Sequence, residues 1–231
     1  MIGILGGMGT QASLDFCNKL AMLNRGKIDQ KYPLFILYNK SNIPGRPENL
    51  HKYNKVLKSL YTGCLLLQKN NCKFIVIPCN TAHYWYDDLQ RKIKIPIVSM
   101  PKEVYLHVKK NCKKNSKIGI LATEATLKTR VYNKFFDKNF ILINPTKSLQ
   151  IKSVNIAIKY IKMGKIKDAA KVIKPAINYL IKLKCNKIIL GCTELPIAIF
   201  AFKSLKKAKQ SKIFIDPNLL LAEVSMKKYK K

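Results

Sequence analysis

The feature that most constrains the fold of this chain is an alternation between short, continuously apolar segments and longer amphipathic ones. Residues 2–5, 74–77 and 188–190 are apolar runs of strand length, whereas residues 10–24 place apolar side chains at the spacing of a helix. Strands that are apolar on both faces are typical of parallel sheets covered by helices on both sides. The sequence therefore predicts an α/β fold with parallel sheets.

The alternation runs through the whole chain and starts again after about residue 100. Strands are expected at 2–5, 34–38, 74–77, 97–99, 117–121, 140–143, 188–190 and 213–215. Helices are expected at 10–24, 50–69, from 83 to 92, 126–136, 148–163, 165–183, just after 194, and from 217 to the end. The second half echoes the first, which predicts two similar α/β domains, 1–99 and 100–216. We expect the last helix, 217–231, to pack back on the first domain.

Composition narrows the class of protein. The 231 residues are 48% hydrophobic, enough for a substantial core, but no apolar run reaches the roughly 18 residues of a membrane span. The N-terminus lacks the pattern of a signal peptide, so the expected location is the cytoplasm. The cysteines are odd in number, seven, and form no CxxC pair, which argues against a disulfide framework or a zinc site.

The charge is strongly positive, with 44 Lys and Arg against 12 Asp and Glu. Binding to nucleic acid or to an anionic membrane is one interpretation. However, only four of these residues are arginine, and the lysines are spread over every expected helix. The sequence thus favours solvated basic faces over a nucleic-acid site, and a positive field would speed the arrival of an anionic substrate.

Candidate site residues lie where expected strands end, because ligands of open parallel sheets bind beyond the carboxyl ends of strands. The first such turn is LGGMGT, with Met8 at its centre. It fits a dinucleotide-binding fingerprint loosely, but Tyr38 and Asn39 stand where that fold needs an acidic residue. A tight turn whose backbone N–H groups approach a small anion is the better interpretation, and a purely steric need for glycine is the alternative.

Two further turns each carry a cysteine. PCNTAH follows the third strand, and its Cys79 is expected at the N-terminal turn of a helix, where the dipole lowers the pKa of a thiol. Asn80 and Thr81 offer donors for a carboxylate, and His83 either tunes the thiol or caps the helix. GCTEL repeats this context with Cys192 and Thr193, and Glu194 is a candidate to influence the second thiol. The alternative for either cysteine is a buried structural role.

Paired acid/base groups suit racemisation at a carbon next to a carboxylate. One thiolate removes the Cα proton, and the opposing thiol delivers another to the other face. Donors around the carboxylate stabilise the carbanion, and Asn80, Thr81, Thr123, Thr126 and Thr193 are candidates for this role. Nothing in the sequence suggests a metal site or a cofactor.

Together these motifs resemble the cofactor-independent aspartate/glutamate racemases, closest to the aspartate racemase branch. The resemblance rests on GILGGMG, PCNTAH and GCTEL in this order, with NIPGR, LATEAT and IDP between and after them. It implies two Rossmann-like domains, an active site in the cleft between them, a homodimer, and Cys79 and Cys192 as the catalytic thiols. It also implies that Arg46 and Lys162 bind the side-chain carboxylate of an acidic amino acid.

The chain departs from that family at one position. A tyrosine is expected one turn before the lysine, but Ile158 stands there, and Tyr160 cannot share a helix face with it. This departure allows a longer or less polar substrate side chain than aspartate. A decarboxylase, a cis–trans isomerase or a hydantoin racemase of the same fold is the enzymatic alternative, and a basic nucleic-acid-binding module is the non-enzymatic one.

Overall fold

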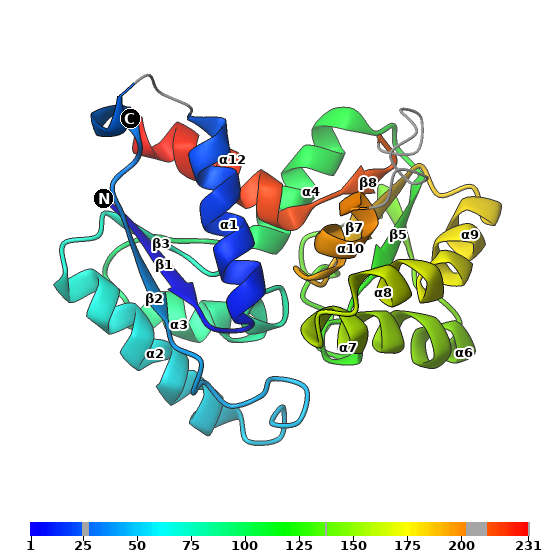
Figure 1. The fold of residues 1–231 in the computed structure, drawn as a ribbon, viewed down its shortest axis with the longest axis horizontal. Coiled ribbons are helices and arrows are strands. Elements are labelled where there is room, and N and C mark those ends of the chain that lie inside the picture. The colour runs from blue at the N-terminus through cyan, green and yellow to red at the C-terminus, as the bar shows by residue number, and fades with distance from the viewer. Residues whose placement is uncertain (25–27, 137, 202–211, 231) are drawn as a thin grey trace. The chain divides into compact units, whose positions relative to one another are not determined.

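The computed structural model describes residues 1–24, 28–136, 138–201 and 212–230. The chain divides into two compact units, Met1–Glu103 with Asn218–Lys231, and Val104–Pro217. Within the described residues each unit contains one four-stranded sheet with all neighbouring strands parallel (Figure 1). The predicted α/β class with two parallel sheets is confirmed.

The first unit is built around the sheet β2-β1-β3-β4. Its elements are β1 (Ile2–Gly6), α1 (Thr10–Leu23), η1 (Asp29–Lys31), β2 (Phe35–Asn39), α2 (Tyr53–Lys69), β3 (Phe74–Val76), η2 (Thr81–Trp85), α3 (Tyr86–Lys92), β4 (Ile97–Val98) and α12 (Pro217–Tyr229). Successive strand residues point to opposite faces, so Ile2 and Ile4 pack with Phe16 of α1 while Leu5 packs with α2 and α3. Both faces of this sheet are therefore buried.

The C-terminal helix is held on the first unit by polar contacts as well as by the core. The Asn218 side-chain amide donates to the carbonyl of Ala12, at 3.0 Å. At the other end of α12, the Tyr229 hydroxyl accepts from the backbone N–H of Leu34, at 3.2 Å. These contacts join segments about as far apart in the sequence as this chain allows.

The second unit is built around the sheet β6-β5-β7-β8. Its elements are α4 (Met100–Asn111), in which the chain passes from the first unit to the second, β5 (Ser116–Leu121), α5 (Glu124–Lys128), β6 (Phe140–Ile143), α6 (Lys147–Leu149), the π-helix η3 (Gln150–Asn155), α7 (Ile156–Lys162), α8 (Ile166–Val172), α9 (Lys174–Lys182), β7 (Lys187–Leu190), α10 (Leu195–Ala201) and β8 (Phe214–Ile215). A core of aliphatic side chains from α7, α8 and α9 packs with Ile188 and Leu190 of β7.

The two sheets have the same strand order, and this positions the site. In each unit the first strand lies between the second and the third, so the chain leaves it first to one side and then to the other. Such a reversal of order is where open parallel sheets bind ligands, beyond the carboxyl ends of the two central strands. The central pairs are β1 with β3, where Ile4 lies opposite Val76, and β5 with β7, where Leu121 lies opposite Leu190.

Several helices differ from their predicted bounds. The helix predicted at 126–136 ends at Lys128, and Arg130 has a left-handed backbone, with φ of 53°. The helix predicted at 165–183 is two helices, because Pro175 in the first turn of α9 has no N–H to continue α8. The helix predicted at 148–163 contains the π-helix η3, and helix α4 was not predicted.

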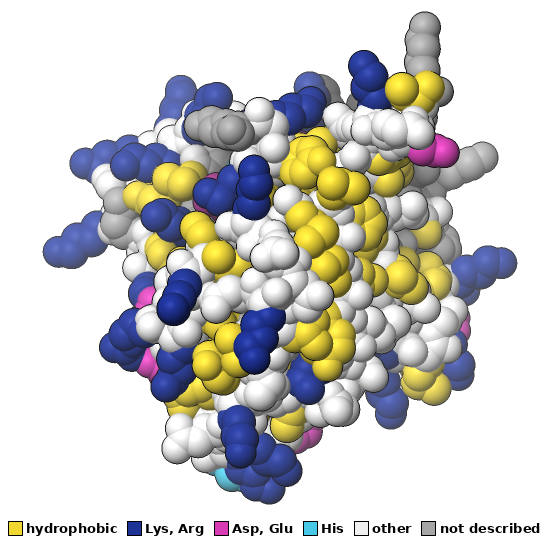
Figure 2. Space-filling view, turned by 90° about the vertical axis from the view of Figure 1, so that its left-hand side faces the viewer, with side chains coloured by type: hydrophobic (Ala, Val, Ile, Leu, Met, Phe, Trp, Pro, Cys, Tyr) yellow, Lys and Arg dark blue, Asp and Glu magenta, His cyan; other side chains and the backbone are white. Residues whose placement is uncertain are grey.

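On the face of the molecule drawn in Figure 2, the basic side chains are spread out and are not gathered into one block. Lys and Arg side chains are scattered there between hydrophobic ones. Exposed apolar side chains of the first unit include Leu14, Met22, Leu34 and Phe35. Among the described residues no helix is both long enough and apolar enough to cross a membrane.

Candidate active site

The two candidate cysteines occupy equivalent places in the two sheets. Cys79 follows β3 after Ile77 and Pro78, and Cys192 follows β7 after Gly191. Both lie beyond the carboxyl end of the third strand of their own unit, next to the turn that follows the first strand. Their side chains are nearly buried, with exposed fractions of 5% and 6%. A small molecule that reached either thiol would meet it largely screened from solvent.

In the first unit, His83 holds the turn that carries Cys79. Its Nδ1 lies 2.9 Å from the carbonyl oxygen of Cys79, and its Nε2 accepts from the backbone N–H of Met100, at 3.1 Å. Because Nε2 accepts, the ring proton must be on Nδ1, which donates to Cys79. Burial lowers the pKa of His83 to about 4, and its backbone hydrogen bonds oppose that shift only in part. His83 is therefore a neutral support for the backbone of the cysteine.

Arg46 contacts the turn that contains Met8. Its Nη2 donates to the carbonyl of Met8, at 2.8 Å, and its Nη1 donates more weakly to Pro44, at 3.5 Å. The turn needs glycine at position 7, because Gly7 has a φ of 88° and a β-carbon there would overlap the backbone of Lys40. The contact from Arg46 thus joins two predicted substrate-binding residues from distant loops of the first unit.

In the second unit, Cys192 has a carboxylate partner. Its thiol donates to Oε2 of Glu194, at 3.0 Å, and both side chains are buried. Burial raises the pKa of Cys192 well above its ordinary value, and the charge and hydrogen bond of Glu194 raise it further. The positive charge of Lys162 acts in the opposite direction and lowers the pKa of Cys192, but less than burial and Glu194 raise it. At neutral pH the thiol of Cys192 is therefore protonated.

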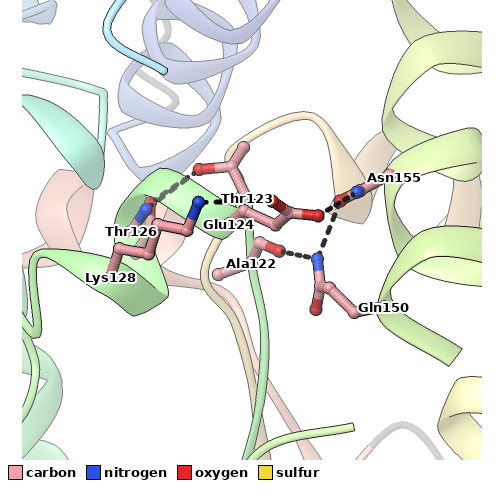
Figure 3. A network of polar contacts seen from close by, with 7 residues as sticks. All are labelled: Ala122, Thr123, Glu124, Thr126, Lys128, Gln150 and Asn155. Atoms are coloured by element: carbon pink, nitrogen blue, oxygen red, sulfur yellow. Dashed lines mark hydrogen bonds and ion pairs between the residues drawn. The ribbon is translucent and has the colours of Figure 1, made fainter. Parts of the chain in front are cut away.

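The turn after β5 carries two predicted substrate-binding threonines in direct contact. The Thr123 hydroxyl accepts from the backbone N–H of Thr126, at 3.2 Å, and the two hydroxyl oxygens are 3.0 Å apart. Thr123 thereby caps the start of α5. Figure 3 shows this turn together with the side chains of Gln150 and Asn155, which approach it from η3.

The remaining predicted residues lie in the same turns. Asn80 and Thr81 are buried at the start of η2, and Thr193 is buried between Cys192 and Glu194. Each unit thus gathers its own set of predicted residues: Met8, Arg46, Cys79, Asn80, Thr81 and His83 in the first, and Thr123, Thr126, Lys162, Cys192, Thr193 and Glu194 in the second.

The position that departs from the family pattern is part of the core. Ile158 has an exposed fraction of 6% and packs in the aliphatic cluster of the second unit. Tyr160 is half-buried, and the ammonium group of Lys165 lies over its ring, 5.9 Å from the centroid. The helix face of Ile158 therefore offers no polar group one turn before Lys162.

Sequence reasoning missed residues that reach the site from other segments. Tyr132 is buried, and its pKa is raised well above its ordinary value by burial, by the charge of Asp216 and by Cys192 once that thiol ionises. Gln150 and Asn155 contact the turn of Thr123 from the π-helix. No spacing in the sequence connects these residues with the motifs. Among the described residues, no group of three or more His, Cys, Asp and Glu side chains is arranged to hold a metal ion.

Comparisons with known proteins agree on one family. The family model described as Asp/Glu/Hydantoin racemase matches residues 5–224. The chain is 27% identical over 202 residues to the broad specificity amino-acid racemase RacX of Bacillus subtilis, covering 84% of this chain and 86% of that one. It is 29% identical to a glutamate racemase of Sulfurihydrogenibium sp., covering 76% of this chain and 66% of that protein.

A comparison of structures gives the same result. The Picrophilus torridus aspartate racemase superimposes with a TM-score of 0.84 and 29% identity, covering all of this chain and 94% of that one. A glutamate racemase structure from Thermus thermophilus superimposes with a TM-score of 0.69 at 19% identity, which shows a shared fold.

Proposed function

Because this chain belongs to the Asp/Glu/hydantoin racemase family, we propose that it interconverts the L and D forms of aspartate, glutamate or both without a cofactor. The reaction is an isomerisation in which a proton leaves the α-carbon on one face and another arrives on the opposite face. Cys79 and Cys192 are the two acid/base groups of the proposal. The observation that carries it is their equivalence: each follows the third strand of a sheet with the same order.

The proton transfers balance without any further reagent. The thiolate of one cysteine takes the Cα proton and becomes a thiol, and the electron pair of the broken C–H bond spreads into the substrate carboxylate. The thiol of the other cysteine then gives its proton to the opposite face and becomes a thiolate. The next turnover in the same direction needs the two cysteines to exchange protons with solvent, and the reverse reaction uses them in opposite roles.

The state of Cys192 supports a starting role as the acid. Burial and the Glu194 carboxylate both raise the pKa of this thiol, so it carries a proton at neutral pH. When Cys192 acts as the base for the opposite enantiomer, its proton must first leave. Glu194, 3.0 Å from the sulfur, is the proposed route for that proton.

Binding of the substrate is divided between its two carboxylates in this proposal. Hydroxyl and amide donors of Asn80, Thr81, Thr123, Thr126 and Thr193 hold the α-carboxylate, where negative charge grows in the transition state. Arg46 and Lys162 hold the side-chain carboxylate. Arg46 supports this role with a guanidinium already oriented by Met8, and Lys162 with its electrostatic interaction with Cys192.

The substrate range is proposed to extend beyond aspartate. Ile158 is buried and apolar at the position where the aspartate racemase pattern has a tyrosine, so one polar contact near Lys162 is absent from this helix face. The relatives named above include an aspartate racemase, a glutamate racemase and a broad specificity racemase. We expect aspartate and glutamate to be turned over at comparable rates, and a chiral assay over all acidic and small polar amino acids would measure this.

The proposal is tested by following a pure enantiomer in heavy water. Wild-type protein should equilibrate L- and D-substrate and place deuterium at Cα. Cys79→Ser and Cys192→Ser should each lower racemisation by at least about 10³-fold, because a serine hydroxyl is a far weaker acid than a thiol. Turnover near the wild-type rate in either variant would contradict the two-cysteine mechanism.

A matched control separates loss of a catalytic thiol from general damage. Cys112→Ser changes a half-buried cysteine just after α4, which interacts with Lys187 at the start of β7, the opposite end of that strand from Cys192. It should keep wild-type turnover and a similar melting temperature. Absence of racemisation of any amino acid by the wild type would favour another reaction of this fold, which a panel of decarboxylase, isomerase and hydantoin substrates would identify.

A further inference from the structure

The π-helix η3 brings together two amides that an ordinary helix would separate. Gln150 and Asn155 are five residues apart, which is about 1.4 turns of an α-helix, so their side chains would point in different directions there. In η3 they meet: Nε2 of Gln150 donates to Oδ1 of Asn155, at 2.8 Å. π-helical turns are rare in proteins, and those that occur frequently lie at functional sites.

The two amides form a chain of hydrogen bonds that ends on the turn after β5 (Figure 3). Gln150 Nε2 also donates to the carbonyl oxygen of Ala122, at 2.9 Å, and Asn155 Nδ2 donates to Oε1 of Glu124, at 2.8 Å. A backbone carbonyl only accepts, so Gln150 must present its NH₂ group there. Asn155 must then accept with Oδ1 and donate with Nδ2, and Glu124 must accept. The direction of every bond in the chain is therefore fixed.

The chain of bonds holds the residues on both sides of Thr123. Ala122 is held through its backbone and Glu124 through its side chain. Gln150 is buried, so loss of its bonds would leave polar groups without water. An exposed ion pair between Glu124 and Lys128, at 3.8 Å, adds little by comparison.

We infer that Gln150, Asn155 and Glu124 are positioning residues that fix the Thr123–Thr126 turn for binding of the substrate α-carboxylate. This inference rests on the proposed function for the role of the two threonines, and on the structure alone for the hold on the turn. The π-helix makes these hydrogen bonds possible, because it places both amides on one side of the segment that leads into α7 and Lys162.

The fixed direction of the bonds allows a swap experiment. Asn155→Asp replaces the amide that donates to Glu124 by a second carboxylate, so two acceptors face each other. The double variant Glu124→Gln with Asn155→Asp restores a donor and an acceptor in reversed order, and Gln150 still donates to position 155. Glu124→Gln alone keeps an acceptor for Asn155 and tests the effect of the lost charge.

Two readouts are measured well below the melting temperature of each variant. Asn155→Asp should speed amide hydrogen exchange in residues 122–127 and raise the KM for an acidic amino acid by at least about fivefold, with a smaller effect on kcat. The double variant should bring both values back to within about twofold of wild type. Wild-type exchange and KM in Asn155→Asp, or no recovery in the double variant, would overturn the inference.

A second variant and a control keep the test decisive. Gln150→Met removes the hydrogen bonds to Ala122 and Asn155 with little change of side-chain shape. It should therefore show the same faster amide exchange and higher KM. This variant takes the place of Asn155→Asp if Asn155→Asp does not fold. Gln90→Met removes a comparable amide that bonds to Ile93 and Ile95 in the first unit. It should lower stability without changing KM. If wild-type protein racemises nothing, the proposed function fails, and the exchange data alone decide whether the turn is held by this chain of bonds.

Discussion

His83 is fixed as a neutral imidazole by the two backbone groups that it contacts. The Met100 N–H points at Nε2, and the Cys79 carbonyl accepts from Nδ1–H. Adding a proton to Nε2 would place two donors face to face inside the core. The histidine of PCNTAH therefore acts on the cysteine through its backbone and supplies no charge to the thiol.

This orientation predicts a specific dependence of stability on pH. In the folded protein burial lowers the pKa of His83 from 6.5 to about 4, so between these values only the unfolded chain binds the proton. The contribution of His83 is complete above pH 6.5 and is lost as the pH falls through 4. The loss amounts to about 3 kcal/mol. We expect the free energy of unfolding of His83→Gln to change less between pH 7 and pH 4 than that of the wild type, as measured by urea denaturation.

His51 provides the matched control for this measurement. It is exposed, so His51→Gln should leave the change between pH 7 and pH 4 as large as in the wild type. Equal pH dependence of His83→Gln and wild type would show that His83 titrates normally in the folded protein.

Some of the candidate site residues could be identified from the sequence, and others could not. Cys79 and Cys192 were identifiable because each follows an apolar strand and is followed by small polar residues, a local pattern. Gln150 and Asn155 were not, because their role depends on a π-helical turn and on a strand end some 30 residues earlier. Tyr132 could not be identified from the sequence for the same reason, since its neighbours Asp216 and Cys192 come from other segments.

At the scale of elements, two turns depend on a left-handed glycine but differ in their surroundings. Gly164 follows α7 with a φ of 74°, and a β-carbon there would have no neighbour within 4 Å. Gly7 follows β1 with a φ of 88°, and a β-carbon there would overlap the backbone of Lys40. The turn at Gly164 needs glycine for its backbone conformation alone, whereas the turn at Gly7 needs it for packing as well.

Alanine at each position should separate the two effects. Gly164→Ala should lower the free energy of unfolding by about 1 kcal/mol, the cost of a left-handed alanine. Gly7→Ala should lower it by more than about 2 kcal/mol, because a backbone shift is added. It should also displace Met8 and the carbonyl that Arg46 contacts. Chemical denaturation of both variants measures the difference. Equal losses in the free energy of unfolding would show that the backbone around Gly7 shifts at little cost.

The order of the strands was predictable from their short apolar runs, whereas helix α4 and the bounds of several other helices were not. Helix α4 was missed because Pro101 lies at its second residue and charged residues follow. Proline is tolerated in a first turn, where its missing N–H has no partner to lose. Met100, Val104 and Val108, four residues apart and buried, were the signal that could have identified it. The π-helix had no such signal, since it depends on side-chain hydrogen bonds to Ala122 and Glu124, which follow β5.

At the scale of the whole molecule, the same four-strand arrangement occurs twice, and each copy carries one of the two candidate cysteines after its third strand. The turns LGGMGT and LATEAT follow equivalent first strands, and PCNTAH and GCTEL follow equivalent third strands. In the proposed mechanism each face of the planar carbanion needs one acid/base group, and the repeat provides one candidate thiol in each unit. We propose that the protein works as a homodimer, and light scattering should then give twice the chain mass of 26.4 kDa.

The net charge of +32 leads to a prediction that separates the enzyme from a nucleic-acid-binding module. Basic side chains are scattered over the face in Figure 2. Two of the four arginines are held by protein partners, Arg46 by Met8 and Arg91 by Asp88.

We therefore expect only charge-driven binding to a DNA duplex, weaker than about 10 μM at 150 mM salt. Polyglutamate of equal charge should bind similarly, because neither polyanion meets a site with phosphate geometry. Fluorescence anisotropy over a salt series measures both. Submicromolar binding to the duplex alone at 150 mM salt would mean that the basic surface recognises nucleic acid.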